Sequence, residues 1–396
     1  MNEAILTLNA GSSSLKLSVH AATGERLLVS GLVDSIGGDG TLRLKDGDGA
    51  ELAAQTSVAD FRDHQAALAT VLGVLREVLP GLDVAAVGHR VVHGGPDFKA
   101  HAVLDTAILE RLAAFSSLAP LHQPHNLAGI RAALAAFPAA AQVACFDTAF
   151  HRTHPFVNDV FALPRAYYDK GVRRYGFHGL SYEYIASELA RRAPLLAEGR
   201  VVVAHLGNGA SMCAMQDGRS VASTMGFSAL DGLPMGTRCG QLDPGVVLHL
   251  MVEEGMDAKA ISDLLYKRSG LLGLSGLSND MRTLEAAGTP EADEAIDYFV
   301  FRIQRELGAM AAALGGIDSL VFCGGIGENS RLVRARVCER MAWMGIELDP
   351  ARNAANAEVI SSDLARTTVL VIPTNEELVI ARATRRLALG STRSAA

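Results

Sequence analysis

Two turns of small residues occupy similar places in the two halves of the 396-residue chain. The first is 9–16 (NAGSSSLK), and the second is 205–209 (HLGNG). Small residues let backbone N–H groups and hydroxyls approach a phosphate, and Lys16 would add a positive charge. A single turn of this kind is more typical of an ordinary hairpin. Two of them facing one cleft would hold a polyphosphate.

A third glycine-rich segment, 320–330 (LVFCGGIGENS), indicates a strand, a glycine turn and a helix N-terminus. Such a helix start directs backbone donors toward an anion or a ribose. A dinucleotide-binding motif is the alternative, because Gly325, Gly327 and the later Glu347 fit part of it. Ser330 replaces its third glycine and the segment comes late in the chain, which disfavours a dehydrogenase. The P-loop pattern, GxxxxGK followed by Ser or Thr, does not occur in the sequence.

Several charged or titratable side chains follow predicted strands or lie between glycines. Arg90 lies in 88–95 (GHRVVHGG) and Arg238 in 236–240 (GTRCG). An arginine offers a planar fork to a carboxylate or a phosphate, although a single arginine is more often a structural ion-pair donor. The other candidates are Asp147, His178 and His122. A lone histidine is more often a core or surface residue, and an aspartate at a strand end is often a helix cap.

The segment 374–377 (TNEE) contains a capping signal and one additional carboxylate. Thr374 followed by Glu377 forms a capping box, so we expect these two residues to cap a helix. Glu376 is not needed for the cap. Together with Asn9 it could supply oxygen ligands to Mg²⁺, which takes few protein ligands and keeps water and phosphate oxygens.

The elements that would position these residues follow an α/β pattern. Short apolar or alternating segments before residue 45 predict a β-meander, and helices and strands then alternate. The opening hairpins recur half a chain later, where Gly207 matches Gly11 and Gly218 matches Gly24. We therefore predict two related α/β domains, 1–150 and 151–380, with a helix at about 380–396 that packs back on the first. Ligands are expected in the cleft between the domains.

The composition limits the class of protein. Hydrophobic residues make up 49% of the chain and charged residues 20%, which is typical of a globular protein. The formal net charge of -7 disfavours nucleic acid as a partner. Five cysteines without metal-binding spacing indicate free thiols. The sequence contains neither a signal-peptide pattern nor a membrane-spanning stretch, so we expect a cytoplasmic protein.

In this order, the motifs resemble those of acetate kinases, the acetokinase family within the acetate and sugar kinase, heat-shock chaperone and actin superfamily. The resemblance covers nearly the whole chain and rests on segments 8–16, 88–95, 146–151, 175–179, 205–209, 236–240, 325–329 and 374–377. It implies two ribonuclease-H-like (actin-like) domains with the active site in the cleft between them. It also implies a homodimer that forms acyl phosphate and ADP from a short carboxylate and ATP, with Mg²⁺ or Mn²⁺.

The resemblance implies a role for each matching residue. Asn9 and Glu376 would bind the metal, and Arg90, Arg238 and His178 would neutralise charge during phosphoryl transfer. The remaining catalytic positions are Asp147 and His122. The acyl pocket would contain Arg90, Val92, Leu121 and Phe177. The nucleotide would contact Lys16, His205, Leu206, Gly207, Asn208, Gly209, Asp280, Met281, Arg282, Gly325, Ile326, Gly327, Glu328 and Asn329.

Chemistry qualifies the role of Asp147, which family descriptions often call a proton donor or acceptor. A carboxylate substrate is already ionised at pH 7 and has no proton to lose. Asp147 therefore fits better as a residue that orients the metal, water or an arginine.

The sequence departs from the family pattern at several positions. The family usually continues Gly-Thr-Ser-His after His178, whereas this chain has 179–182 (GLSY). Ala229 replaces a proline of the acyl pocket, and Gln241 occupies the position of a usual aspartate. The smaller Ala229 leaves room for propionate, so a propionate or other short-chain acyl kinase is the alternative function. A nucleotide-dependent switch of the chaperone or actin type is the alternative of another class, but it would not need the two arginines.

Overall fold

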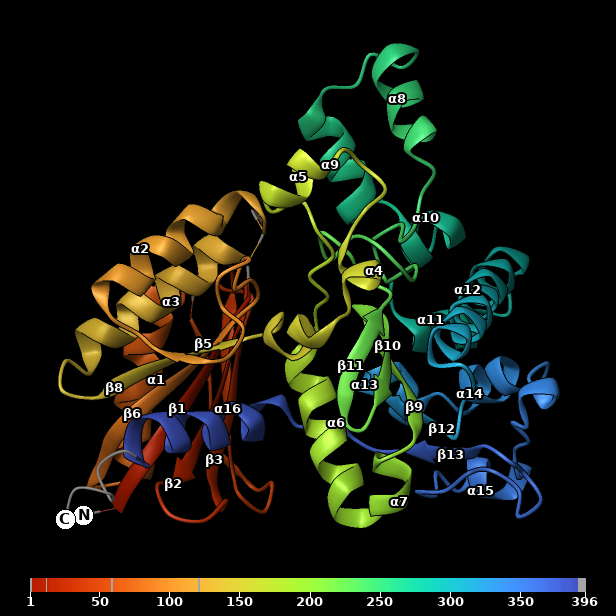
Figure 1. The fold of residues 1–396 in the computed structure, drawn as a ribbon. Helices are drawn as coiled ribbons and strands as arrows, with labels where there is room; N and C mark the ends of the chain where they lie inside the picture. The colour runs from red at the N-terminus through yellow and green to blue at the C-terminus, as the bar shows by residue number, and fades with distance from the viewer. Residues whose placement is uncertain (1, 12, 58–59, 120–121, 391–396) are drawn as a thin grey trace. The chain divides into compact units, whose positions relative to one another are not determined.

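The computed structural model describes residues 2–11, 13–57, 60–119 and 122–390. These residues form two compact units, each with its own sheet (Figure 1). Unit 1 contains the described residues up to Phe150 and those from Asn375 onward, and unit 2 contains His151–Thr374. The domain boundaries inferred from the sequence stay a prediction.

Within the described residues, unit 1 is built on a mixed sheet with the strand order β5-β4-β3-β2-β1-β6-β8-β7. Strands β1 to β5 form an antiparallel meander, whereas β6 and β8 run parallel to β1. Alternate burial along β4 shows that the meander buries one face. The strands are β1 (Asn2–Ala10), β2 (Leu15–Ala21), β3 (Leu27–Asp34), β4 (Gly40–Asp46), β5 (Glu51–Ser57), β6 (Leu82–Val91), β7 (Ala102–Val103) and β8 (Ala141–Phe146).

Helices cover both faces of the unit 1 sheet. Val87 on β6 belongs to an apolar cluster that includes Ala133 of α3. The next residue, Gly88, points to the other face, where a Cβ atom would collide with Ile380 and Thr384 of α16. Glycine at this position therefore lets α16 pack closely on the sheet. The helices are α1 (His64–Val78), α2 (Thr106–Ala114), α3 (Gln123–Ala136) and α16 (Glu376–Thr384), with a 3₁₀ turn at Phe115–Ser117 and a π-helical turn at Arg385–Leu389.

Unit 2 has a mixed sheet with the order β11-β10-β9-β12-β13 among its described strands. β9, β10 and β11 are antiparallel, whereas β12 and β13 run parallel to β9. β9 and β10 are buried on both faces, which agrees with their nearly continuous apolar sequences. The strands are β9 (Arg200–Leu206), β10 (Ala210–Gln216), β11 (Arg219–Ser223), β12 (Ser319–Cys323) and β13 (Thr368–Val371).

The helices of unit 2 differ widely in length. The longest, α12, packs against β9, β10 and β11, and α6 also contacts β9. None of the described helices in either unit combines the length and apolarity needed to cross a membrane. The helices are α4 (Phe156–Asp159), α5 (Arg165–Asp169), α6 (Gly179–Arg192), α7 (Pro194–Ala197), α8 (Pro244–Val252), α9 (Ala258–Lys267), α10 (Gly270–Ser275), α11 (Met281–Ala287), α12 (Pro290–Leu314), α13 (Gly324–Asn329), α14 (Arg331–Cys338) and α15 (Pro350–Ala354), with 3₁₀ turns at Ala149–Thr153 and Ala342–Met344.

The two sheets share one topology. The order β3-β2-β1-β6-β8 in unit 1 corresponds to β11-β10-β9-β12-β13 in unit 2, with the same strand directions. Gly24 and Gly218 occupy corresponding hairpin turns with φ of 72° and 68°, which favours glycine at both. The predicted α/β fold of two related halves is confirmed. The sequence analysis missed β5, because its residues show little apolar alternation and the strand forms by pairing with β4.

Candidate active site

Three predicted residues of unit 1 lie at the same edge of the sheet. Asn9 is near the end of β1, Arg90 is near the end of β6, and Asp147 directly follows β8. The parallel pairing of β1 with β6 and of β6 with β8 brings these ends together. The carboxyl ends of parallel strands are the usual place for ligands in α/β proteins.

Asp147 holds the guanidinium of Arg90 at two nitrogens. Nε donates to Oδ1 at 3.0 Å and Nη2 donates to Oδ2 at 2.6 Å. The third nitrogen, Nη1, lies 3.4 Å from Oδ1 of Asn9 and 3.8 Å from the carboxylate of Glu376. Burial disfavours the charged guanidinium, but Asp147 and Glu376 outweigh this effect and raise the pKa of Arg90. Arg90 is therefore a fixed cation with Nη1 directed toward Asn9 and Glu376.

The start of α16 differs from the predicted capping box. Asn375 is the N-cap, and its side chain accepts the Leu378 N–H at 3.0 Å. Glu377 instead pairs with Lys16, with 2.6 Å between Nζ and Oε1. The capping prediction for Thr374 and Glu377 was wrong, because the helix begins one residue later and a lysine of β2 takes the glutamate.

Glu376, the carboxylate not needed for the cap, is largely buried beside Arg90. Burial raises the pKa of Glu376, Arg90 opposes the shift, and Asp147 raises it further. Asn9 and Glu376 offer amide and carboxylate oxygens, the donor type that Mg²⁺ prefers. The residues therefore fit a divalent cation. A separate cluster of three or more His, Cys, Asp or Glu residues suited to a metal is absent from the described part of the chain.

The predicted acyl-pocket residues fall in both units. Val92 in unit 1 and Phe177 in unit 2 are both buried. The carbonyl of Phe177 accepts from Nε2 of His151 at 2.9 Å. His122 directly precedes α3 and makes no side-chain capping bond there. Leu121 lies outside the described residues.

Asn126 of α3 is a structural link that the sequence analysis missed. Its Oδ1 accepts the N–H of Val92 at 3.0 Å, and its Nδ2 donates to the carbonyl of Ala10 at 2.8 Å. Asn126 thus joins the ends of β1 and β6 beside Asn9 and Arg90. A single asparagine inside a helical segment carries no spacing signal, so only the folded chain reveals this role.

In unit 2, His178 and Arg238 meet at the turn between β9 and β10. A Cβ atom at Gly209 would lie 3.2 Å from Nη2 of Arg238 and 3.3 Å from Nε2 of His178. The absence of a side chain at this position leaves both groups directed at the turn. Nδ1 of His178 bonds Ser211 Oγ at 2.8 Å, and the His178 ring stacks on His205 with 4.3 Å between centroids.

Backbone contacts fix the loop that carries Arg238. Nη1 of Arg238 donates to the carbonyl of Ala229 at 2.6 Å. The N–H of Gly236 donates to the carbonyl of Asn208 at 3.0 Å, and a Cβ atom at Gly236 would collide with the Asn208 side chain. Glycine at 236 therefore allows the loop to approach the turn. Ala229 holds the arginine through its backbone, which the sequence analysis did not foresee.

The predicted nucleoside segment at the start of α11 lies next to the same turn. Nδ2 of Asn279 donates to Oδ1 of Asn208 at 3.2 Å, a link that the sequence analysis also missed. Asp280 caps α11, and hydrogen bonds from Arg282 lower the pKa of Asp280 to about 2. Met281 is buried. The exposed part of this segment is therefore the Asp280–Arg282 ion pair.

The glycine-rich segment after β12 passes directly from the strand into a helix, in the predicted order of strand, glycine turn and helix start. α13 begins directly at Gly324, whose φ of 75° turns the chain from strand to helix. The carboxylate of Glu328 accepts the N–H groups of Gly324 at 2.8 Å and of Thr374 at 3.0 Å. Glu328 thus satisfies the first donor of the helix, and Gly325 and Asn329 are the exposed residues of the segment.

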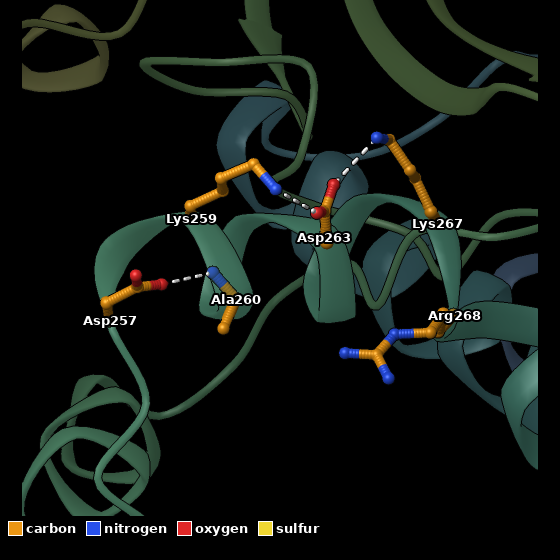
Figure 2. A pocket seen from close by; sticks show the side chains of 6 residues that line it. All are labelled: Asp257, Lys259, Ala260, Asp263, Lys267 and Arg268. Atoms are coloured by element: carbon orange, nitrogen blue, oxygen red, sulfur yellow. Dashed lines mark hydrogen bonds and ion pairs between the residues drawn. The ribbon is translucent and has the colours of Figure 1, made fainter.

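A surface hollow of about 560 Å³ on α9 contains none of the predicted site residues (Figure 2). Lys259 and Lys267 line it, and both pair with Asp263, at 3.7 and 2.6 Å. A single carboxylate of their own helix therefore contacts both lysines.

An arginine and a histidine directed at a glycine turn, in an α/β chain, are typical of a phosphotransferase. Comparison with known proteins agrees. The model of the acetokinase family matches residues 4–382. An acetate kinase from Methylocella silvestris is 59% identical over 98% of this chain and 98% of its own length.

Solved structures give the same result. An acetate kinase from Porphyromonas gingivalis has a TM-score of 0.87 at 38% identity, covering 96% of this chain and 98% of its own. A propionate kinase from Francisella tularensis has a TM-score of 0.91 at 35% identity, covering 97% and 100%. The chain belongs to the acetokinase family, as its motifs predicted, and is a phosphotransferase with a carboxyl group as acceptor.

Proposed function

We propose that the protein transfers the γ-phosphoryl group of ATP to acetate, reversibly, giving acetyl phosphate and ADP. The observation that carries this proposal is the convergence of Arg238 and His178 on Gly209, with 3.2 and 3.3 Å to its Cβ position. Phosphoryl transfer places negative charge on the equatorial oxygens, and fixed donors stabilise that charge. A turn without side chains lets a phosphate approach both donors.

The residues of unit 1 serve the acceptor and the metal in this proposal. Arg90 binds the acetate carboxylate with a guanidinium that Asp147 holds in place. Asp147 is 1% exposed and both of its oxygens contact Arg90, so it orients the arginine rather than moving a proton. For the acyl pocket we propose Val92, Leu121 and, from unit 2, Phe177, with His122 as a further active-site residue.

Asn9 and Glu376 hold a divalent cation, Mg²⁺ in the first instance and Mn²⁺ as a substitute. When bound, the cation neutralises charge on the phosphate oxygens. Lys16 and the 205–209 turn bind the phosphates, and residues 280–282 and 325–329 bind the nucleoside.

Propionate is a second candidate acceptor. Ala229 is smaller than the proline expected in the acyl pocket, and its carbonyl holds Arg238 at 2.6 Å. A longer acyl chain would use the space that a proline ring fills. Turnover with acetate, propionate and butyrate, measured side by side, would rank the three acids. The Ala229→Pro variant should then shift the preference toward acetate.

Trapping the product as its hydroxamate tests the proposed reaction directly. Purified protein with ATP, Mg²⁺ and acetate should give acetyl hydroxamate and ADP in equal amounts. Omission of acetate is the control, because a nucleotide-dependent switch would still release ADP without an acyl product. The proposal would be contradicted if ADP were released but none of the three acids gave a hydroxamate.

The proposal also includes a cytoplasmic homodimer. None of the five cysteines, which all lie among the described residues, forms a disulfide, and four of them are buried, which is typical of a reducing compartment. α8 has no buried residue, and Leu248 and Val252 are 62% and 75% exposed. An apolar helix of this kind is a candidate for contact with a second copy of the chain.

A further inference from the structure

Tyr182 connects to His178 through a chain of two hydrogen bonds. The phenol oxygen lies 2.5 Å from Ser211 Oγ, and Ser211 Oγ lies 2.8 Å from Nδ1 of His178. Tyr182 and Ser211 are both 0% exposed. His178 and Tyr182 come from the start of α6 and Ser211 comes from β10, so the chain of bonds joins the helix to the sheet.

The directions of these bonds follow from the donors available. A phenol is a better donor and a poorer acceptor than an alcohol, so Tyr182 donates to Ser211. Burial raises the pKa of Tyr182 well above its ordinary value, which keeps the phenol proton in place. With the Tyr182 proton directed at Ser211, the single proton of Ser211 is available to Nδ1 of His178, 2.8 Å away. Nδ1 then accepts, and the imidazole carries its proton on Nε2.

The backbone and ring contacts of His178 fix the orientation of its imidazole. His178 has φ of 56° and ψ of 24°, a left-handed conformation that is unfavourable for a non-glycine residue. Its ring stacks on His205, and the Tyr182 ring also packs edge-on against His205 at 6.5 Å. These contacts hold the plane of the imidazole, but they do not choose which nitrogen is protonated.

We propose that Tyr182 is a positioning residue which, through Ser211, holds His178 as the Nε2-protonated imidazole directed at the Gly209 turn. Nε2–H then donates to the phosphoryl group that Arg238 also contacts. The use of this proton in catalysis rests on the proposed kinase function, whereas the choice of tautomer does not. Tyr182 occupies the position where the family pattern has histidine, another side chain that can donate a hydrogen bond.

The tautomer can be read directly from the ring nitrogens. The full-length protein, labelled with ¹⁵N-histidine, should show His178 protonated at Nε2, with its signals identified by their loss in His178→Asn. Tyr182→Phe removes only the hydroxyl, so Ser211 can then accept from Nδ1 of His178 as well as donate to it. We expect a mixture of the two tautomers in this variant. Tyr175→Phe is the matched control, because it deletes a buried phenol whose bond goes to the Gly171 carbonyl.

Kinetics give a second, independent reading. Tyr182→Phe should lower kcat roughly ten- to hundredfold, with KM for ATP and acetate nearly unchanged. Ser211→Ala should cause a similar loss, and the double variant should lose no more than either single variant, because both act on one chain of bonds. Tyr182→His should recover much of the rate.

Three results would overturn the inference: an unchanged His178 tautomer in Tyr182→Phe, losses that multiply in the double variant, or an equal tautomer change in Tyr175→Phe. A wild-type protein without acyl-phosphate formation would instead contradict the proposed function. The nitrogen spectra would still test Tyr182 in that case.

Discussion

At the scale of single residues, Arg90 and Arg238 carry the positive charge of the proposed site. We expect Arg90→Ala and Arg238→Ala each to lose roughly 10³-fold or more in kcat, because a fixed arginine contributes about this much to phosphoryl transfer. Arg90→Lys should fail as well, since an ammonium cannot replace the fork that Asp147 holds at 3.0 and 2.6 Å. Steady-state assays of acyl phosphate formation measure the effect.

Arg111→Ala is the control for these arginine variants. Arg111 pairs with Asp97 on the surface of unit 1, where both side chains are about half exposed. Its loss should leave kcat within about twofold. Wild-type turnover in a folded Arg90→Ala or Arg238→Ala variant would remove that arginine from the mechanism.

Glu376 should make stability depend on pH. Its pKa is raised from 4.5 in the folded protein, mainly by burial, so the native state binds this proton more tightly than the unfolded state. Stability from this group therefore increases as pH falls through the raised pKa and is lost as pH rises. Without ligands, Glu376→Gln should melt higher than the wild type at pH 7 to 8, and the difference should vanish toward pH 4.

Melting curves between pH 4 and 8, with and without Mg²⁺, measure this pH dependence and the stabilisation by Mg²⁺. Mg²⁺ should stabilise the wild type more than Glu376→Gln. Glu377→Gln is the matched control, because Glu377 pairs with Lys16 and should give no gain at pH 7. A larger loss of Mg²⁺ response in Glu377→Gln than in Glu376→Gln would show that Glu377, and not Glu376, binds the metal.

At the scale of elements, the start of α16 positions Glu376. Asn375 caps the helix by accepting the Leu378 N–H at 3.0 Å. Asn375→Ala should destabilise unit 1 by about 1 kcal/mol and raise the half-saturating Mg²⁺ concentration, because the next residue is the proposed ligand. Asn375→Asp keeps the acceptor and should preserve stability. Chemical denaturation and metal titration of both variants check this prediction. If Asn375→Ala and Asn375→Asp had the same stability and the same half-saturating Mg²⁺ concentration, the cap would not support the site.

At the scale of the whole molecule, α8 is the apolar surface that we propose for contact with a second copy. Leu248 and Val252 are 62% and 75% exposed, and no residue of the helix is buried within the chain. Leu248→Asp with Val252→Asp should convert a dimer to a monomer, because two charges would have to be desolvated at the interface. Light scattering after size exclusion gives the mass. A dimer that survives both changes would place the interface elsewhere.

Much of the chemistry was readable from the sequence. Arg90, Arg238, Asp147 and His178 attract attention because strand ends and glycines surround them, and the repeated hairpins predict two sheets of one topology. These signals are local, since they depend on alternation, turn residues and motif spacing. β5 was missed because pairing with β4 forms it in spite of a weak local pattern.

Only the tertiary structure decided which groups contact one another. Asp147 and Arg90 are 57 residues apart, and strand register brings them together. Glu328 takes the first N–H of its own helix, and Asn375 rather than Thr374 caps α16. Tyr182 reaches His178 through a serine of another element. Such contacts depend on the register of parallel strands and on side-chain packing between distant segments, which local propensity does not encode.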